Sequence, residues 1–472
     1  MHPLDLPSVE IARGIREGRF TSEEVVSESI RRANAVSSTL NPFTVIRDDQ
    51  ALEAARMADR AAARGEAAGA LHGVPFAAKD LTPTAGDLTT LGSWTKENWV
   101  PTETALCIRR LQDAGGILMG KTTTPEFAYS SFTRSPRWGV TRNPWNPERT
   151  PGGSSGGSAV AVATGAVPFA EGTDMGGSVR IPAAFSGIVG LKPSLGRIPM
   201  TILPSVFDNI SHFGPLARSV ADAIAFMTAT CGPSDEDISS LPIGFSADAA
   251  RSGGLEGRRF ALSIDLGYYV VEPEVERVIR AAVAEIHNAG ATVDEVPMGW
   301  TRAVNDEWFD LWCVFMSGFF GDTLRSHRDR MDPAIVSIIE RGLTMNATAY
   351  KRIELLRTRM WQDMAAILKN YDAFLCPTCA ITAPPITQCD DDYVGTAEDG
   401  RFIGLDMTCP FNLIPQLPAL SLPAGLADNG LPVGLQIVGS RFADEHVLSM
   451  AAALESRLRM PRLSDRSTAD SS

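Results

Sequence analysis

Two glycine-rich runs, each of which contains a serine, constrain this chain of 472 residues more than any other feature. Residues 152–158 read GGSSGGS, and residues 174–180 read DMGGSVR. Because glycine has no Cβ, such runs predict tight turns that other backbone segments approach closely. The residues after each run are mainly apolar, which predicts a buried helix over 158–166 and a second helix that begins at Ser178. We therefore expect each run to present a serine on a turn inside a packed protein.

The order of the other segments predicts an α/β protein. A helical pattern over 104–114 ends at Gly115-Gly116 and is followed by a strand pattern over 117–119, an order that is typical of α/β folds. The apolar run 74–78 predicts a buried strand that ends next to Lys79. Further helices are expected over 8–35 (two helices), 51–68, 273–289, 305–324 and 347–368, and a further strand over 260–264.

The acidic composition argues against several classes of partner. The net charge is −13, whereas nucleic acid and anionic membrane surfaces bind proteins that present a basic face. No apolar run approaches the ~20 residues that cross a bilayer, and residues 1–7 lack the basic start and apolar stretch of a signal peptide. We therefore expect a cytoplasmic protein without nucleic-acid or membrane partners.

The cysteines and the acidic residues predict neither a metal site nor a cofactor. Seven cysteines in a chain of this length suit free thiols in a reducing compartment. Cys376 and Cys379 have the spacing of a redox or zinc motif, but no second cysteine or histidine pair accompanies them. We expect both to be buried structural thiols. The acidic run 390–392 is expected to be a solvated loop.

Residues 115–122 match the phosphate-binding pattern G-x-x-x-x-G-K-[ST], but their surroundings argue against nucleotide binding. A phosphate loop needs a strand before it and a helix after it, whereas here a helix precedes the glycines. The variable positions Ile117, Leu118 and Met119 are large and apolar, and such side chains favour burial. The run is therefore expected to be a turn into a core strand.

Lys79 and the two serine-bearing runs predict a serine nucleophile that uses lysine as its base. A serine hydroxyl needs a group that takes its proton, and none of the six histidines lies in a serine-bearing run. His72 is too far from Lys79 along the predicted strand for both to reach one serine. Burial among residues 76–78 would destabilise the ammonium and make a neutral amine available. The alternative is a structural lysine paired with Asp80.

Ser178 is the stronger candidate for the nucleophile. Gly176 and Gly177 directly precede it, so the backbone is free to turn until several N–H groups converge. We expect an oxyanion hole from the amides of Met175, Gly176, Gly177 and Ser178. A helix that begins at Ser178 would add the positive end of its dipole. The alternative role of Ser178 is an ordinary helix N-cap.

Several motifs, taken together and in order, resemble the amidase signature family of serine hydrolases. They lie at 73–80, 120–127, 139–144, 152–158, 174–180, 190–193, 418–423 and 434–439. The resemblance implies an α/β amidase signature fold, in which helices cover both faces of a central mixed β-sheet. It also implies that Ser154 follows a cis peptide bond and relays the proton between Ser178 and Lys79. The residues expected to brace these loops are Ser155, Thr173, Asp174 and Arg180.

The resemblance favours a single amidase domain over residues 1–472, because no linker, long charge run or internal repeat divides the chain. Within this domain the expected parts are N-terminal helices over 1–70, a signature core over 71–200, a variable helical region near the substrate pocket over 300–370, and a flexible tail over 461–472. We expect the protein to be a monomer or a homodimer.

Aromatic residues suggest a hydrophobic substrate. Tyr129, Phe132 and Trp138 lie in a stretch between matching motifs, and a predicted helix carries Trp308, Trp312, Phe315 and Phe319 on one face. The helical face either packs in the core or forms one wall of an apolar pocket. The expected substrate-binding residues are Tyr129, Phe132, Trp138, Trp312 and Phe315. The expected activity is hydrolysis of small hydrophobic amides or anilides, and carbamates and esters are further candidate substrates.

Two alternative functions remain. The first is the glutaminase component of a tRNA-dependent amidotransferase, which usually has Asp where this chain has Pro125 and an aromatic residue where it has Met407. The loop 412–418 is also one residue longer than the common family pattern. These departures favour a stand-alone amidase. The second alternative is an inactive binding protein on the same fold, and the intact lysine and serines argue against it.

Overall fold

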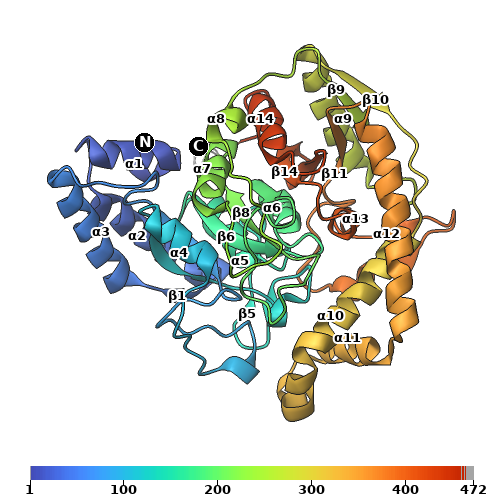
Figure 1. Cartoon of the computed structure of the whole chain (residues 1–472), viewed down its shortest axis with the longest axis horizontal. Coiled ribbons are helices and arrows are strands. Elements are labelled where there is room, and N and C mark those ends of the chain that lie inside the picture. The colour runs from blue at the N-terminus through green and yellow to red at the C-terminus, as the bar shows by residue number, and fades with distance from the viewer. Residues whose placement is uncertain (1, 459, 462, 464–472) are drawn as a thin grey trace.

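The computed structural model describes residues 2–458, 460, 461 and 463, and its central feature is a large mixed sheet (Figure 1). Within these residues the sheet has eleven strands. Their order is β1 (Phe43–Ile46), β3 (Ile117–Thr122), β2 (Pro75–Lys79), β6 (Phe169–Asp174), β8 (His212–Ala217), β7 (Val189–Lys192), β14 (Ala419–Leu426), β15 (Pro432–Val438), β11 (Ala373–Pro377), β9 (Arg259–Leu262) and β10 (Thr292–Glu295). Two groups of neighbouring strands are parallel: β3, β2 and β6, and β11, β9 and β10. The edge strand β1 is antiparallel to β3. All neighbouring pairs from β6 through β8, β7, β14 and β15 to β11 are also antiparallel.

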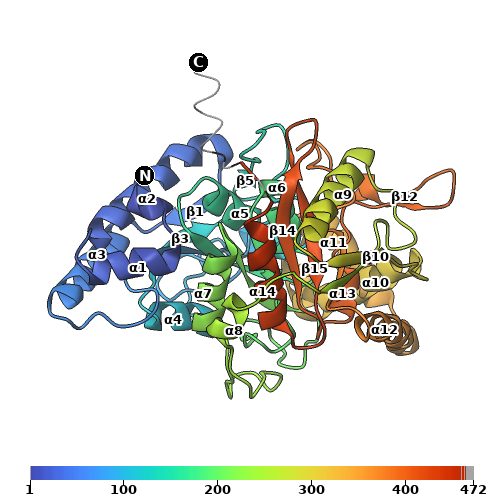
Figure 2. The ribbon, with the colours of Figure 1, turned by 90° about the horizontal axis from the view of Figure 1, so that it is seen from above.

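Helices cover both faces of this sheet (Figure 2). The longer ones are α1 (Ser8–Arg16), α2 (Ser22–Leu40), α3 (Asp48–Ala63), α4 (Leu106–Asp113), α5 (Gly156–Ala163), α6 (Arg180–Ser186), α7 (Val220–Thr230), α9 (Pro273–Asn288), α10 (Ala303–His327), α11 (Pro333–Thr344), α12 (Ala347–Leu368) and α14 (Asp444–Glu455). Phe76 and Ala78 of β2 pack in a core with α1, α4 and α7, whereas Ala77 packs with α3 and α5. Because successive strand residues point to opposite faces, the expected arrangement of sheet and helices is confirmed.

Local sequence explains where several helices begin and end. The Thr21 hydroxyl accepts a hydrogen bond from the Glu24 amide at 3.0 Å, which caps the start of α2. Asn41, with φ of 53°, ends the same helix in the left-handed region that asparagine tolerates. Pro273 occupies the first position of α9, where its missing N–H costs no intrahelical bond.

The expected parts of the chain have the following places in the fold. Residues 1–70 contain α1, α2 and α3, but they also supply β1, which pairs with β3 at one edge of the sheet and was not predicted. The region 300–370 consists mainly of α10, α11 and α12, which lie on the opposite side of the molecule from α1–α3 (Figure 1). The expected flexible tail lies outside the described residues, apart from 461 and 463.

The helix predicted to begin at Ser178 begins instead at Arg180. Gly177 has φ of 137°, which is far from helical geometry. The Val179 amide donates to the Asp174 carboxylate at 3.2 Å, and Val179 is the N-cap of α6. Ser178 therefore lies in the turn between β6 and α6.

Candidate active site

Lys79 and the first glycine-rich run meet at the end of β2. Lys79 is fully buried, and its Nζ donates hydrogen bonds to the hydroxyls of Ser154 at 2.7 Å, Ser155 at 2.9 Å and Thr173 at 3.0 Å. The peptide bond between Gly153 and Ser154 is cis. The sequence-predicted base and relay are thus in direct contact, and Asp80, the alternative partner of Lys79, is not bonded to it.

Burial sets the protonation of Lys79. Removal from water lowers the pKa of its ammonium to about 7, against the opposing charges of Glu171 and Asp174. Glu171 is buried beside it: its carboxylate accepts from the Lys79 amide at 2.8 Å and from the Thr82 hydroxyl at 2.9 Å. Burial also raises the pKa of Glu171, so both groups are shifted towards their neutral forms. The amine is therefore available as a base near neutral pH.

Ser178 belongs to the second glycine-rich run, and its backbone contacts this cluster. The residue is half-buried, and within the described part of the chain its hydroxyl makes no hydrogen bond. Its carbonyl accepts from the Ser155 amide at 3.2 Å, which joins the two runs. The amides of Gly176, Gly177 and Ser178 likewise have no acceptor among the described residues. A hydroxyl and several N–H groups are therefore free to meet a ligand at this turn.

A buried ion pair fixes the base of the same turn. Arg180 donates to the two carboxylate oxygens of Asp174 at 2.9 and 3.0 Å, and both side chains are inaccessible to solvent. Arg180 also donates to the side-chain oxygens of Gln436 at 2.7 Å and Asn412 at 2.6 Å. Burial alone would raise the pKa of Asp174, but the charge and hydrogen bonds of Arg180 outweigh it and hold the pKa well below its usual value. The Asp174–Arg180 ion pair, with its hydrogen bonds to Gln436 and Asn412, therefore anchors the base of the turn.

Two residues from distant helices and loops hold the turn from its other side. The Thr408 hydroxyl donates to the Gly176 carbonyl at 2.6 Å, and the Trp308 indole donates to the Met175 carbonyl at 3.1 Å. Both bonds engage carbonyl oxygens, which leaves the N–H groups of the turn for a ligand. Sequence reasoning missed this role, because Thr408 lies 232 residues from Gly176 and no local pattern connects them.

We expect Gly177→Ala to lower kcat/KM by about 10²-fold or more, because catalytic geometry tolerates little displacement. A Cβ at this position would lie 1.9 Å from the Thr408 hydroxyl, and φ of 137° disfavours any side chain. The matched control is Gly318→Ala on α10, where a Cβ meets nothing within 4 Å. Steady-state kinetics on one amide compares the two, and wild-type kcat/KM for Gly177→Ala would show that the turn does not require glycine.

Lys121, in the run that matches a phosphate loop, is a structural lysine. It lies fully buried in β3, and its Nζ donates to the Thr82 carbonyl and to the Thr89 hydroxyl, both at 2.6 Å. Asp80 is its partner at 3.8 Å. These contacts leave no room for a nucleotide phosphate, so the expected turn into a core strand is what the chain forms.

The cysteines and the acidic run also have structural positions. Cys376 and Cys379 are buried and unpaired, as expected. The run 390–392 forms a short helical turn, and the Asp390 carboxylate accepts from the Ser130 hydroxyl at 2.5 Å and from the Ser131 amide at 3.0 Å. The expectation that this run is wholly solvated is therefore wrong for Asp390, because that carboxylate ties the loop to residues 130–131.

An apolar cavity of about 220 Å³ opens beside the turn that carries Ser178. Its wall includes Met175 of that turn and aromatic side chains of three segments that are separate in the sequence. The aromatic lining residues are Trp99, Phe127, Phe315, Phe319 and Phe320. The cavity therefore suits a hydrophobic group attached to a carbonyl bound at the turn.

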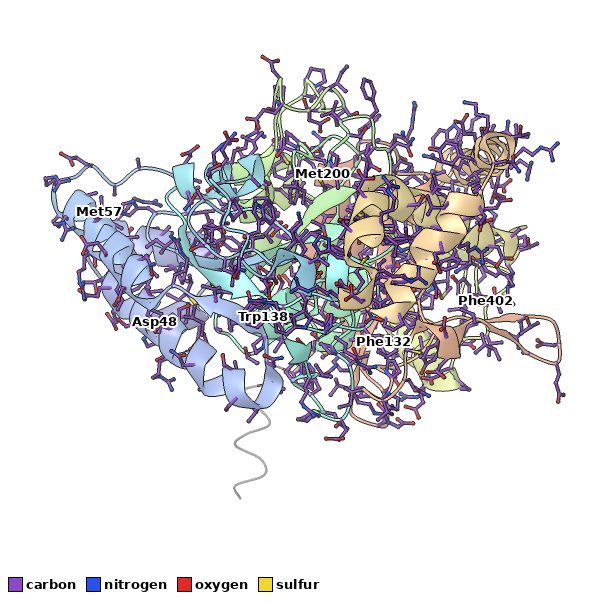
Figure 3. The ribbon with its side chains drawn as sticks, turned by 90° about the horizontal axis from the view of Figure 1, so that it is seen from below. Asp48, Met57, Phe132, Trp138, Met200 and Phe402 are labelled. Carbon is purple, nitrogen blue, oxygen red and sulfur yellow. The ribbon has the colours of Figure 1, made fainter. Side chains whose placement is uncertain are left out.

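Of the five predicted substrate-binding residues, Phe315 lines this cavity and four have other contacts. Phe132, labelled in Figure 3, packs in a separate cluster that includes Phe185 of α6. The Trp138 indole donates to the Thr90 hydroxyl at 2.8 Å, and the Tyr129 hydroxyl donates to Asp332 at 3.2 Å. Trp312 stacks on Phe315 with ring centroids 5.1 Å apart, so it supports the wall from behind. For these four residues the structure favours packing over the pocket.

Comparison with known proteins agrees with this geometry. Residues 24–448 match the amidase family. An acylamidase of Rhodococcus erythropolis is 34% identical over 95% of this chain and 95% of its own length. A component of the glutamyl-tRNA(Gln) amidotransferase of Acidothermus cellulolyticus is 34% identical over 96% of this chain and 94% of its own length. The crystal structure of a bacterial aryl acylamidase aligns with a TM-score of 0.88 at 29% identity, covering 96% of both chains. This chain belongs to the amidase signature family of amide-hydrolysing enzymes.

Proposed function

We propose that this enzyme hydrolyses amides and anilides of small hydrophobic acids through an acyl-enzyme on Ser178. The observation that carries the proposal is the contact between the buried Lys79 amine and the Ser154 hydroxyl, next to a turn whose own hydroxyl and amides make no hydrogen bond to the described residues. Lys79 contacts the hydroxyls of Ser154 and Ser155, and its pKa of about 7 suits a group that takes a proton from serine near neutral pH.

The proposed reaction has two steps. In the first, the neutral Lys79 amine takes the proton of Ser154 while Ser154 takes that of Ser178, and the Ser178 oxygen attacks the carbonyl carbon. The amides of Met175, Gly176, Gly177 and Ser178 stabilise the negative charge on the carbonyl oxygen. The proton then passes back through Ser154 to the leaving nitrogen, and the C–N bond breaks. In the second step, water attacks the ester by the same route and releases the acid.

The cavity supports a hydrophobic acyl group over glutamine. A glutaminase must bind an ammonium and a carboxylate on the same carbon, whereas Lys96 is the one charged residue among the described residues that line this cavity. A cavity of about 220 Å³ exceeds the roughly 150 Å³ that holds one benzene ring. An aryl or short alkyl acyl group therefore fits the space and its chemistry.

We expect kcat/KM to rise about tenfold per pH unit below pH 7 and to level off above it. The neutral amine is the reactive form of Lys79, so activity grows as pH rises through its pKa of about 7. His212 does not compete, because burial lowers its pKa to about 3. Lys192 is the matched control: burial also lowers its pKa to about 7, but it donates to backbone carbonyls such as that of Leu417 at 2.8 Å. Loss of the pH dependence in Lys192→Met would contradict the assignment.

A substrate panel tests the proposal directly. The purified chain is assayed with anilides, primary amides, esters and carbamates of benzoic and hexanoic acids, and with glutamine. The proposal predicts turnover of the anilides and amides, with or without esters and carbamates, and none of glutamine. Release of ammonia from glutamine together with no turnover of any anilide would favour the amidotransferase alternative.

A further inference from the structure

One lysine, Lys96, lines the aromatic cavity. Lys96 is half-buried, and its Nζ lies 5.5 Å from the ring centroid of Trp99, which is 36% exposed. Met175 lines the same cavity and is only 6% exposed. The lining of the cavity therefore combines Met175, from the turn that carries Ser178, with Lys96 and otherwise mainly apolar side chains.

The charge of Lys96 is not neutralised by the protein. Among the residues that the structure describes, no carboxylate lies within ion-pair distance of its ammonium. The adjacent Glu97 is engaged by Arg330 at 2.9 Å. An uncompensated cation on the wall of an apolar cavity attracts anions strongly, because the low-dielectric walls focus its field.

The other lysines of the chain have different positions. Six of its 43 basic residues are lysines, so arginine is the usual cation of this protein. Lys79, Lys121 and Lys192 are fully buried and bonded inside the core. Lys351 lies on α12 and pairs with Glu354, and Lys369 follows α12 at an exposed position. Among the six lysines, Lys96 is therefore the one that lines this cavity and whose ammonium has no carboxylate partner among the described residues.

We propose that Lys96 binds a carboxylate at the far end of the acyl group, so that the preferred substrates are monoamides of dicarboxylic acids that, unlike glutamine, carry no ammonium group. This inference rests on the proposed function, because it assumes that the acyl group fills the cavity. The scissile carbonyl would lie at the turn with Met175, the apolar chain or ring would contact the aromatic wall, and the terminal carboxylate would meet the ammonium beside Trp99.

The test uses matched pairs of anilides. The monoanilides of succinic, glutaric and adipic acids are compared with the anilides of the unbranched monocarboxylic acids of equal carbon number. For the wild type we expect kcat/KM to favour at least one charged member of these pairs. Lys96→Met should lower kcat/KM for that monoanilide roughly tenfold, mainly through KM, because a hydrogen bond to a charged group is lost. The neutral anilide should change less than about threefold, and added salt should reduce the preference.

Lys369→Met is the matched control, because it removes the same charge from an exposed site outside the cavity. It should leave the preference unchanged. The inference is overturned if Lys96→Met changes charged and neutral anilides equally, if it changes neither, or if only a carboxylate on the aniline responds. These outcomes are distinct from failure of the proposed function, in which the wild type would turn over no anilide at all.

Discussion

Ser178→Ala should abolish measurable hydrolysis, a loss of about 10⁴-fold or more in kcat/KM, because it removes the atom that forms the acyl-enzyme. The same change should alter the free energy of unfolding by less than about 0.5 kcal/mol. The Ser178 hydroxyl is half-buried and has no hydrogen-bond partner among the described residues, so its removal breaks no interaction. Steady-state kinetics on an anilide and thermal unfolding measure the two quantities.

Ser186→Ala is a matched control for this variant. Ser186 lies at the end of α6, it is 1% exposed, and its hydroxyl likewise has no hydrogen-bond partner in the part of the chain that the structure describes. This second serine should be dispensable for activity and nearly neutral for stability. Retention of more than a small fraction of activity by Ser178→Ala would remove Ser178 as the nucleophile, whatever the result for Ser186.

Lys79→Ala and Ser154→Ala should each lower kcat by about 10³-fold or more, and the double variant should lose little beyond the larger single loss. The reason is that both residues take part in the same proton transfer. Removing either one stops this transfer, so removing the second lowers kcat little further. A double variant whose loss equals the product of the single losses would show that the two residues act independently.

Ser155→Ala distinguishes the two serines that contact Lys79. The Ser155 hydroxyl lies 2.9 Å from Lys79 Nζ, against 2.7 Å for Ser154, so distance alone does not select the relay. Because Ser155 also joins the two glycine-rich runs through its amide, we assign it a positioning role and expect a loss of about tenfold. A larger loss for Ser155→Ala than for Ser154→Ala would exchange their roles.

The parts of the site that were predictable from sequence are those set by local constraints. Lys79 was placed at the end of a buried strand because a short apolar run precedes it, and the structure has it there. The glycine-rich runs predicted turns that present serines, and Gly177 adopts a backbone angle that only glycine readily accepts. The error at Ser178 was small: the helix starts two residues later, at Arg180, and Val179 is its N-cap.

The parts that were missed depend on contacts between distant segments. Glu171 lies in β6, whose sequence FAEGTD has neither the alternation nor the continuous apolar character of a typical strand, and its contact with Lys79 spans 92 residues. Trp308 was recognised as part of an aromatic helical face, but its bond to Met175 depends on where α10 packs. The motifs at 418–423 and 434–439 lie largely in β14 and β15, but no strand was predicted for either of them.

The residues that line the substrate pocket were also hard to predict, because they too depend on contacts between distant segments. Phe132 and Trp138 were expected to bind the substrate, yet Phe132 packs against α6 and Trp138 bonds to Thr90. The aromatic residues that do line the cavity include Phe127 and Phe320, which stack on each other at 4.2 Å across 193 residues of sequence. Composition reveals that aromatic side chains are present, but only the packing of α10 decides which of them face a cavity.

The measurement that tests the central claim most directly is the partitioning of the acyl group between water and hydroxylamine. If every substrate acylates Ser178, the anilide and the ester of one acid give the same acyl-enzyme. The leaving group has departed by then, so it cannot affect how that acyl-enzyme reacts. With hydroxylamine present, the ratio of hydroxamate to free acid should then be identical for the two substrates. A ratio that differs between the anilide and the ester, or anilide hydrolysis that yields no hydroxamate while the ester does, would contradict a common Ser178 acyl-enzyme.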